Sequence, residues 1–206
     1  MSNPTIVIAS ELELQTLTPL QSIDHVLTGV GMPAVYRTFL TQNVCGPLIS
    51  LGIAGAYEDV GLRIGDVVIV GSEIVGDLGM ELPSEPGFTP LSAFAFGSTH
   101  RRLSLFAPRI TGVPLVAGCT VSTVTGTRET GARHRDNYGV AIETMEGYAV
   151  ADIASAFNVP CLEVRAISNM ASTRDMKPEN IRTALDALRT FWSEHSEGLL
   201  EALNEA

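Results

Sequence analysis

The chain has 206 residues, of which 45% are hydrophobic and 17% are charged, and its net charge is −10. This composition is typical of a globular protein with a sizeable core, so we expect a single domain over residues 1–206. The negative charge disfavours binding to nucleic acid or to an anionic membrane surface. No apolar run approaches the roughly 18 residues of a membrane-spanning helix, and residues 1–4 lack the basic segment of a secretory signal. We therefore expect a cytoplasmic protein.

Cysteine and histidine positions give no indication of a metal site. Cys45, Cys119 and Cys161 each lie in an apolar stretch, which predicts buried free thiols in a reducing compartment. The four histidines are scattered, and neither C-x-x-C nor H-x-x-x-H spacing occurs. We expect no structural metal.

Strand-length apolar runs alternate with amphipathic stretches along the chain, which indicates an α/β fold. Strands are predicted for residues 5–9, 25–30, 47–54, 67–75, 113–122 and 161–167. Helices are predicted for residues 10–17, 33–42, 128–137 and 146–157. A last helix has Pro178 in its first turn and apolar residues at helical spacing, namely Ile181, Leu185, Leu188, Trp192, Leu199 and Leu203. Residues 76–99 are rich in Gly, Pro, Ser and Phe, and they are predicted to form a long irregular segment of the kind that often carries function.

Three glycine-rich stretches are candidate ligand contacts. Residues 29–34 satisfy G-x-G-x-x-[GA], but a dinucleotide site also needs an acidic residue about 20 positions later, and residues 50–56 contain none. Residues 52–55 lack the Lys and Ser or Thr of a P-loop, so they form either a tight strand exit or a close approach to a ligand. Residues 118–127 offer hydroxyls and amides after a strand, although threonines are also ordinary strand residues.

Acidic side chains follow two of the predicted strands. Glu11 and Glu13 come directly after the first strand, and Glu143 and Glu146 stand at a later junction of the same kind. The dipole of a helix N-terminus would be sufficient to explain both pairs. Ligands of open α/β sheets bind at the C-terminal ends of strands, however, so a site there is the alternative.

The last predicted strand contains an arginine in an otherwise apolar run. Arg165 would be buried there and would need a carboxylate or an anionic ligand as its partner. Ser168 and Asn169 end the same strand, so polar groups again gather at the C-terminal edge of the sheet.

Six short strings occur in the order and at the spacing of one enzyme superfamily. They are Ala9–Glu13, Thr28–Gly31, Leu51–Gly55, Arg63–Val68, Glu143–Gly147 and Val164–Asn169. The chain therefore resembles the purine nucleoside phosphorylase and nucleosidase superfamily, and most closely the futalosine hydrolases of the menaquinone pathway. The resemblance implies a three-layer α/β/α sandwich with a mixed, twisted central sheet. It also implies hydrolysis of the N-ribosidic bond of futalosine to hypoxanthine and dehypoxanthine futalosine.

The resemblance implies roles for residues at the ribose and the attacking water. Glu13 would hold and activate the water, and Arg165 would lie near that water and the Glu13 carboxylate. Met145 and Glu146 would lie under the ribose, with Glu146 accepting hydrogen bonds from the sugar hydroxyls. A small-molecule nucleoside would be the ligand, with no cofactor and no metal, and the protein would be a homo-oligomer.

The resemblance also implies a base-recognition set. Asn169 would read the purine, Ser168 would orient it, and Thr125 and Gly126 would lie in the loop that lines the base. The adenosine-type nucleosidases have Asp at the position of Asn169. A 6-oxopurine protonated at N7 presents an acceptor and a donor, which an amide matches with its NH₂ and C=O groups. Asn169 therefore favours a hypoxanthine or guanine leaving group.

The nucleophile is predicted from a second departure. Phosphorylases of this superfamily carry an early Gly-Asp-Pro-x-Arg loop for phosphate, and here that place holds Ser10–Glu13, whose negative charge would repel phosphate. Water is therefore the expected nucleophile. Three alternatives remain: a 5′-methylthioadenosine/S-adenosylhomocysteine nucleosidase of the same fold, a non-catalytic nucleoside-binding module, and a dinucleotide oxidoreductase. Carboxylates at both position 13 and position 146 favour an enzyme over the binding module.

Overall fold

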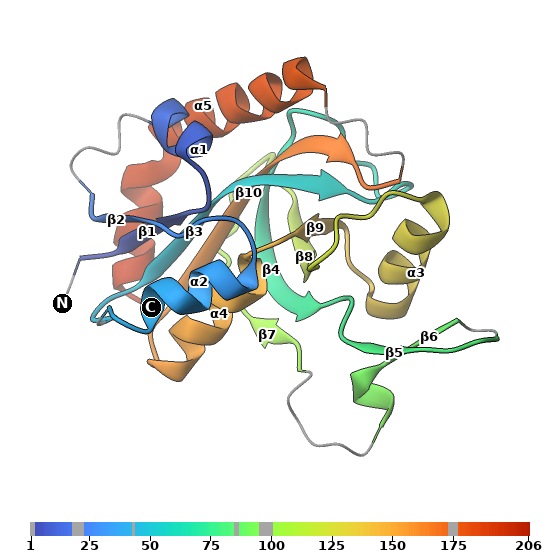
Figure 1. Ribbon diagram of the computed structural model, residues 1–206. Helices are drawn as coiled ribbons and strands as arrows, with labels where there is room; N and C mark the ends of the chain where they lie inside the picture. Colours follow the sequence, from blue (N-terminus) through green and yellow to red (C-terminus); the bar gives the residue numbers. More distant parts are fainter. Residues whose placement is uncertain (1–2, 18–22, 43, 85–86, 95–100, 173–176) are drawn as a thin grey trace.

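A computed structural model of the protein describes residues 3–17, 23–42, 44–84, 87–94, 101–172 and 177–206. Its strands are β1 (Thr5–Ile8), β2 (His25–Leu27), β3 (Leu48–Ala56), β4 (Val67–Val75), β5 (Gly79–Glu81), β6 (Phe88–Pro90), β7 (Leu103–Ser104), β8 (Leu115–Thr120), β9 (Ile142–Thr144) and β10 (Cys161–Met170). Its α-helices are α1 (Glu11–Thr16), α2 (Met32–Phe39), α3 (Arg128–Tyr138), α4 (Gly147–Ala156) and α5 (Pro178–Asn204) (Figure 1). A short 3₁₀ turn, η2, spans Leu91–Ala93.

The central sheet is mixed and partly closed on itself. Its strands follow the order β10-β4-β8-β9-β3-β1-β2, and β10 also pairs with β3, so five strands form a ring. The β3–β10, β4–β8 and β8–β9 pairs are parallel, whereas β10–β4 and β3–β9 are antiparallel. The predicted α/β architecture with a mixed central sheet is confirmed.

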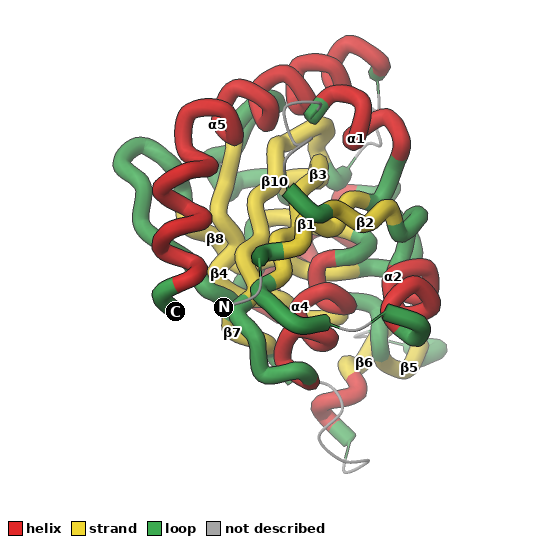
Figure 2. Tube along the Cα trace, turned by 90° about the vertical axis from the view of Figure 1, so that its left-hand side faces the viewer, coloured by secondary structure: helices red, strands yellow, loops and turns green. Residues whose placement is uncertain are grey.

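Helices cover both faces of the sheet, as Figure 2 shows. Helix α5 packs on β10, β3 and β4 and contacts α1, while α4 lies on the opposite face with α2 against it. Of the six α5 residues that the spacing assigned to the core, five are buried there, including Leu188 at 0% and Trp192 at 3% exposure, whereas Ile181 in the first turn is only partly buried. Burial of each such side chain stabilises the fold by roughly 1.5–3 kcal/mol.

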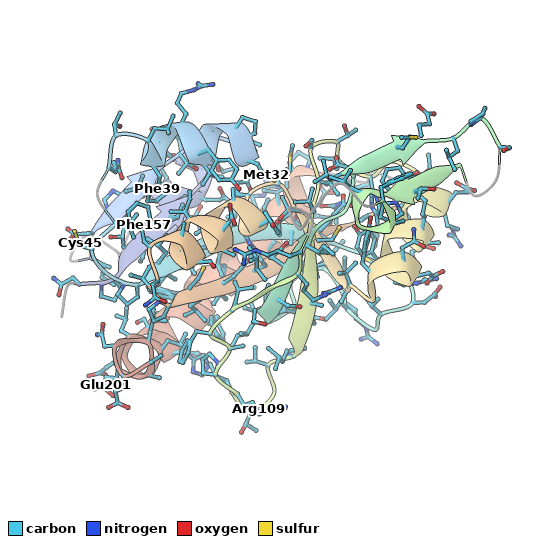
Figure 3. All side chains as sticks on the ribbon, turned by 90° about the horizontal axis from the view of Figure 1, so that it is seen from below. Met32, Phe39, Cys45, Arg109, Phe157 and Glu201 are labelled. Atoms are coloured by element: carbon cyan, nitrogen blue, oxygen red, sulfur yellow. The ribbon has the colours of Figure 1, made fainter. Side chains whose placement is uncertain are left out.

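Several predictions about local structure need correction. The segment 76–99 is not wholly irregular, because β5 and β6 form an antiparallel hairpin within it; residues 85–86 and 95–99 of that segment lie outside the described residues. Cys45 is exposed, because it lies in the connection before β3 rather than in the strand. Helix α4 spans Gly147–Ala156 rather than residues 146–157, and Phe157, its C-cap residue (Figure 3), is 47% exposed. Cys119 and Cys161 are buried free thiols, as predicted.

Two further elements were not predicted. Strands β7 and β9 are only two and three residues long, too short to show a periodic pattern. Strand β9 nevertheless joins β8 to β3 and so completes the ring. Within the described residues, none of the helices combines the length and apolar character needed to span a membrane.

Candidate active site

A cavity opens at the C-terminal ends of the parallel strands, where the polar side chains were expected to gather. Five of the eight residues predicted to form the site line it: Glu13, Met145, Glu146, Ser168 and Asn169. Apolar side chains and strand backbone complete the wall, notably Leu12, Val30, Ile53, Ala54, Gly55, Val121, Val124 and Leu185. Among the described residues that line the cavity, there is no Lys, Arg or His.

Glu13 both caps helix α1 and faces the cavity. Its Oε2 atom accepts hydrogen bonds from the backbone N–H of Ser10 at 3.0 Å and from the Ser10 hydroxyl at 2.7 Å, and the Ser10 hydroxyl caps the N–H of Glu13. This is a capping box, which fixes the side chain through local structure. Its Oε1 atom accepts the backbone N–H of Ile53 on β3 at 3.1 Å. Glu11, by contrast, is exposed.

Glu146 is held at the same cavity by the glycine motif of residues 29–31. The backbone N–H of Gly31 donates to Glu146 Oε1 at 2.7 Å, and both Gly29 and Gly31 have positive φ angles, of 87° and 92°. The motif thus presents an amide to a carboxylate of the same chain, which gives it a function other than dinucleotide binding. Burial raises the pKa of Glu146, while Arg165 and the Gly31 amide oppose that shift.

A β-bulge places both Ser168 and Asn169 in the cavity. Successive side chains of a regular strand point to opposite faces, but the register of β10 against β3 shifts between Ile167 and Asn169. The Ser168 hydroxyl contacts the Ala54 carbonyl at 3.2 Å and Asn169 Oδ1 at 3.0 Å. Asn169 Nδ2 is buried and has no hydrogen-bond partner among the described residues. A residue of the cavity wall therefore has an unused donor.

Glu143 lines the same wall, although it was not among the eight predicted site residues. It lies on β9 directly opposite Gly55, which also pairs with Asn169 on the other side. The Tyr57 hydroxyl donates to Glu143 Oε2 at 3.1 Å and the Thr125 backbone N–H to Oε1 at 2.9 Å. Burial raises the pKa of Glu143, and these two donors counteract the shift.

Arg165 does not line the cavity, and its guanidinium lies beside the Glu13 carboxylate. It is 1% exposed and lies behind Glu13, because its position on β10 precedes the bulge. A methyl group on Gly52 would lie 2.5 Å from Arg165 Nη1 and 2.6 Å from Glu13 Oε1, so both atoms approach the same side of this glycine. Arg165 also donates to Glu163 Oε1 at 2.8 Å and to Ser50 Oγ at 2.7 Å.

Thr125 and Gly126 also lie outside the cavity wall. The amide of Thr125 is used by Glu143, and its hydroxyl points toward His134, 3.5 Å from Nδ1. Gly126 is exposed. Val121 and Val124 of the same connection line the cavity instead. The described residues include no cluster of three or more His, Cys, Asp or Glu suited to a metal ion.

Comparisons with known proteins agree with this geometry. The family model of the phosphorylase superfamily matches residues 24–203. A futalosine hydrolase of Streptomyces coelicolor is 37% identical over 68% of this chain and 61% of its own length, and one of Thermus thermophilus is 30% identical over 78% and 75%. The chain thus spans less than two thirds of the Streptomyces protein. A 5′-methylthioadenosine/S-adenosylhomocysteine nucleosidase of Mycobacterium bovis is 29% identical over 71% of this chain and 69% of its own length.

Solved structures of both kinds of enzyme share the fold. The futalosine hydrolase of Helicobacter pylori superposes with a TM-score of 0.76 at 14% identity, covering 96% of this chain and 98% of the other. The Neisseria meningitidis 5′-methylthioadenosine/S-adenosylhomocysteine nucleosidase reaches 0.76 at 16% identity, with full coverage of both chains. The ring of strands, the cavity at its C-terminal edge and the match over residues 24–203 all agree, and the chain belongs to the phosphorylase superfamily.

Proposed function

We propose that this protein hydrolyses the N-ribosidic bond of futalosine and releases hypoxanthine and dehypoxanthine futalosine. The observation that carries the proposal is the unpartnered Nδ2 atom of Asn169, a buried donor on the cavity wall. Three futalosine hydrolases at 30–37% identity support the choice of substrate.

The wall beside Gly55 complements the edge of a 6-oxopurine. Asn169 Nδ2 donates to O6, and its Oδ1 accepts from a protonated N7. The Glu143 carboxylate accepts from N1–H, which lies on the other side of O6. Adenine would present an amino group to the amide donor and an unprotonated N1 to the carboxylate, and both pairs would be mismatched. Unmatched buried polar groups cost about 1–3 kcal/mol each.

The opposite wall serves the sugar and the water. Glu146 accepts hydrogen bonds from the ribose hydroxyls through the oxygen that Gly31 does not use, and Met145 packs under the ring. Glu13 holds the attacking water and takes its proton as the oxocarbenium-like transition state collapses. General-base assistance of this kind contributes roughly 100- to 10,000-fold. Arg165 acts as a positioning residue for Glu13 rather than as a contact to the substrate.

The nucleophile is water rather than phosphate. Phosphate carries negative charge and needs cationic or amide donors, whereas the described residues at this cavity include three Glu and no basic side chain. A phosphate ion there would face repulsion in a low-dielectric site.

A 5′-methylthioadenosine/S-adenosylhomocysteine nucleosidase is the second candidate, supported by the mycobacterial relatives at 29% identity. Asn169 and Glu143 distinguish the two candidate activities, because both residues complement a 6-oxo base.

The test is chromatography of the free base after incubation with futalosine, inosine, adenosine or methylthioadenosine, with and without phosphate. Hypoxanthine from futalosine at a rate independent of phosphate supports the proposal. Faster release of adenine from methylthioadenosine would establish the second candidate instead.

We also propose a single-domain homo-oligomer that works in the cytoplasm. Leu12 and Val30 at the cavity mouth are 53% and 60% exposed, and contact with a second copy would bury them. The free thiols of Cys119 and Cys161 suit a reducing compartment. Light scattering of the purified protein measures the oligomeric state, and a monomer would contradict this part of the proposal.

A further inference from the structure

Two glutamates inside the strand ring have no role in the chemistry proposed above. Glu73 on β4 and Glu163 on β10 are both fully buried, at 0% exposure. One oxygen of each is satisfied: Glu163 Oε1 accepts from Arg165 Nε at 2.8 Å, and Glu73 Oε2 accepts from the Thr120 hydroxyl at 2.9 Å.

The other two oxygens lack donors and approach the same glycine, Gly147. Glu73 Oε1 and Glu163 Oε2 have no hydrogen-bond partner among the described residues. A methyl group on Gly147, the first residue of α4, would lie 2.8 Å from each of these two atoms. Two ionised oxygens that lack donors and face each other away from water would carry a cost of several kcal/mol. A proton between them removes that cost.

The charges around Arg165 lead to the same conclusion. Burial lowers the pKa of this guanidinium, but Glu163, Glu146 and Glu13 raise it more, so one cation faces three carboxylates. Glu13 and Glu146 also have backbone N–H donors. Glu73 has the Thr120 hydroxyl and the Ile74 backbone N–H, whereas Glu163 forms an ion pair with Arg165, so of these two glutamates Glu73 is less able to carry a charge.

We propose that Glu73 and Glu163 share one proton: the protonated Glu73 donates a hydrogen bond from its Oε1 atom to Oε2 of Glu163. Glu163 held in this way is a positioning residue for Arg165 and, through Arg165, for Glu13. The effect on hydrolysis rests on the function proposed above, whereas the shared proton does not. Glu163 keeps its charge toward Arg165, and its second oxygen gains a donor.

The groups that face Glu73 agree with this assignment. Burial and the neighbouring Glu163 raise the pKa of Glu73 well above its ordinary value of 4.5, and the Thr120 hydroxyl and Arg165 only partly oppose the shift. Its other titratable neighbours are thiols whose own pKa burial raises, namely Cys119 of β8 and Cys161 of β10. The folded protein therefore keeps a proton on Glu73 at pH values at which the unfolded chain has already lost it.

Unfolding measured against pH tests the proton without any substrate. At pH values between the ordinary carboxyl pKa and the raised pKa, folding takes up one proton at Glu73. This proton uptake makes the folding equilibrium constant of the parent fall by up to tenfold for each unit that the pH rises. Glu73→Gln has the same shape and an amide donor but takes up no proton. The ratio of the folding constants of Glu73→Gln and parent should therefore rise as the pH is raised above the ordinary carboxyl value of 4.5. Trp192, the single tryptophan, reports the transition.

Kinetics of the two matched amide variants test the positioning role. Glu163→Gln moves the negative charge from the Arg165 side to Glu73, whereas Glu73→Gln leaves it on Glu163. We expect kcat of Glu163→Gln to be about tenfold below that of Glu73→Gln, because the ion pair with Arg165 becomes a hydrogen bond from the guanidinium to a neutral acceptor. KM should change little, since Arg165 does not reach the cavity.

Each part of the proposal can be overturned separately. A ratio of folding constants that does not change with pH would overturn the shared proton, even if no nucleoside is hydrolysed. Equal kcat values for the two variants would overturn the positioning role. If Glu163→Gln does not fold, Ser50→Ala removes the other Arg165 partner and should lower kcat without a change in KM. Infrared spectra of the parent at neutral pH should then show a protonated carboxyl band that Glu73→Gln lacks.

Discussion

Glu13 and Glu73 are both buried carboxylates that approach a glycine, yet their surroundings differ. At Gly52, the Glu13 oxygens accept three hydrogen bonds from Ser10 and Ile53, and the Arg165 guanidinium lies beside them. At Gly147, Glu73 has the Thr120 hydroxyl and an oxygen without a donor. The first arrangement stabilises a charge at the cavity, and the second favours a proton inside the sheet.

This difference shows how one arginine interacts with two sets of glutamates, one at the cavity and one inside the sheet. Arg165 lies between the cavity layer of Glu13 and Glu146 and the inner layer of Glu163 and Glu73. If every carboxylate were ionised, the four negative charges would exceed what one guanidinium can balance in a dry interior. Backbone and hydroxyl donors stabilise the carboxylates on the cavity side, and the proposed proton on the inner side would leave Arg165 with one fewer negative charge to balance.

Replacement of the cavity carboxylate should have the largest effect. Glu13→Gln conserves shape and removes the proton acceptor for water, so we expect kcat to fall by roughly 100-fold or more. The matched control is Glu11→Gln in the same turn of α1, where the side chain is exposed. Steady-state kinetics with futalosine measure both variants. Near-parental turnover in Glu13→Gln would remove the base role from this residue.

A carboxylate added to the cavity layer should change the choice of base. In Asn169→Asp an ionised aspartate faces O6 of hypoxanthine, and two acceptors then meet without a donor. We expect the preference for futalosine over its 6-amino analogue to fall by about 5- to 150-fold in kcat/KM. Competition between the two substrates in both proteins measures this ratio directly. An unchanged ratio would mean that Asn169 does not read the purine.

Much of the fold could be predicted because long elements carry strong patterns. Strand β4 begins and ends at the predicted residues, and the core face of α5 follows from its spacing. Strand β9 could not be predicted, because its three residues pair with distant strands rather than showing a local pattern.

The site could be predicted only as far as local sequence determines it. Glu13 and Ser10 form a capping box within four residues, which a sequence reveals. The bulge at Ser168 depends on the register between β10 and β3, and the role of Glu143 depends on Tyr57, far away in the chain. Neither leaves a local signal. The sequence also could not show that Arg165 lies outside the cavity wall, because the direction of its side chain depends on how β10 pairs with its neighbours.

Crowding of the inner layer should cost stability rather than turnover chemistry. In Gly147→Ala the new methyl group would lie 2.5 Å and 2.8 Å from the two Glu163 oxygens and 2.8 Å from Glu73 Oε1. We expect the free energy of unfolding to fall by about 1–3 kcal/mol, the usual cost of overpacking. In Gly198→Ala on α5, nothing lies within 4 Å of the new atom, so this control should gain about 1 kcal/mol. Denaturant unfolding of both variants that showed the same sign would contradict the tight contact at Gly147.

The smallest expected effect concerns the pH at which the cavity layer loses its charge. Glu146 must be ionised to accept hydrogen bonds from the sugar hydroxyls, and burial raises its pKa although Arg165 and the Gly31 amide oppose the shift. As pH falls, the group therefore takes up its proton above the ordinary carboxyl value of 4.5, and KM should rise there while the protein remains folded. Glu146→Gln cannot take up this proton, so its KM should be higher at neutral pH and should lose this acid dependence. A 2′-deoxy substrate should show a weaker dependence in the parent, since one of the hydrogen bonds to Glu146 is absent. If KM rose in the same way at low pH in the parent and in Glu146→Gln, the proton would belong to another group of the cavity, and Glu146 would not be the sugar contact.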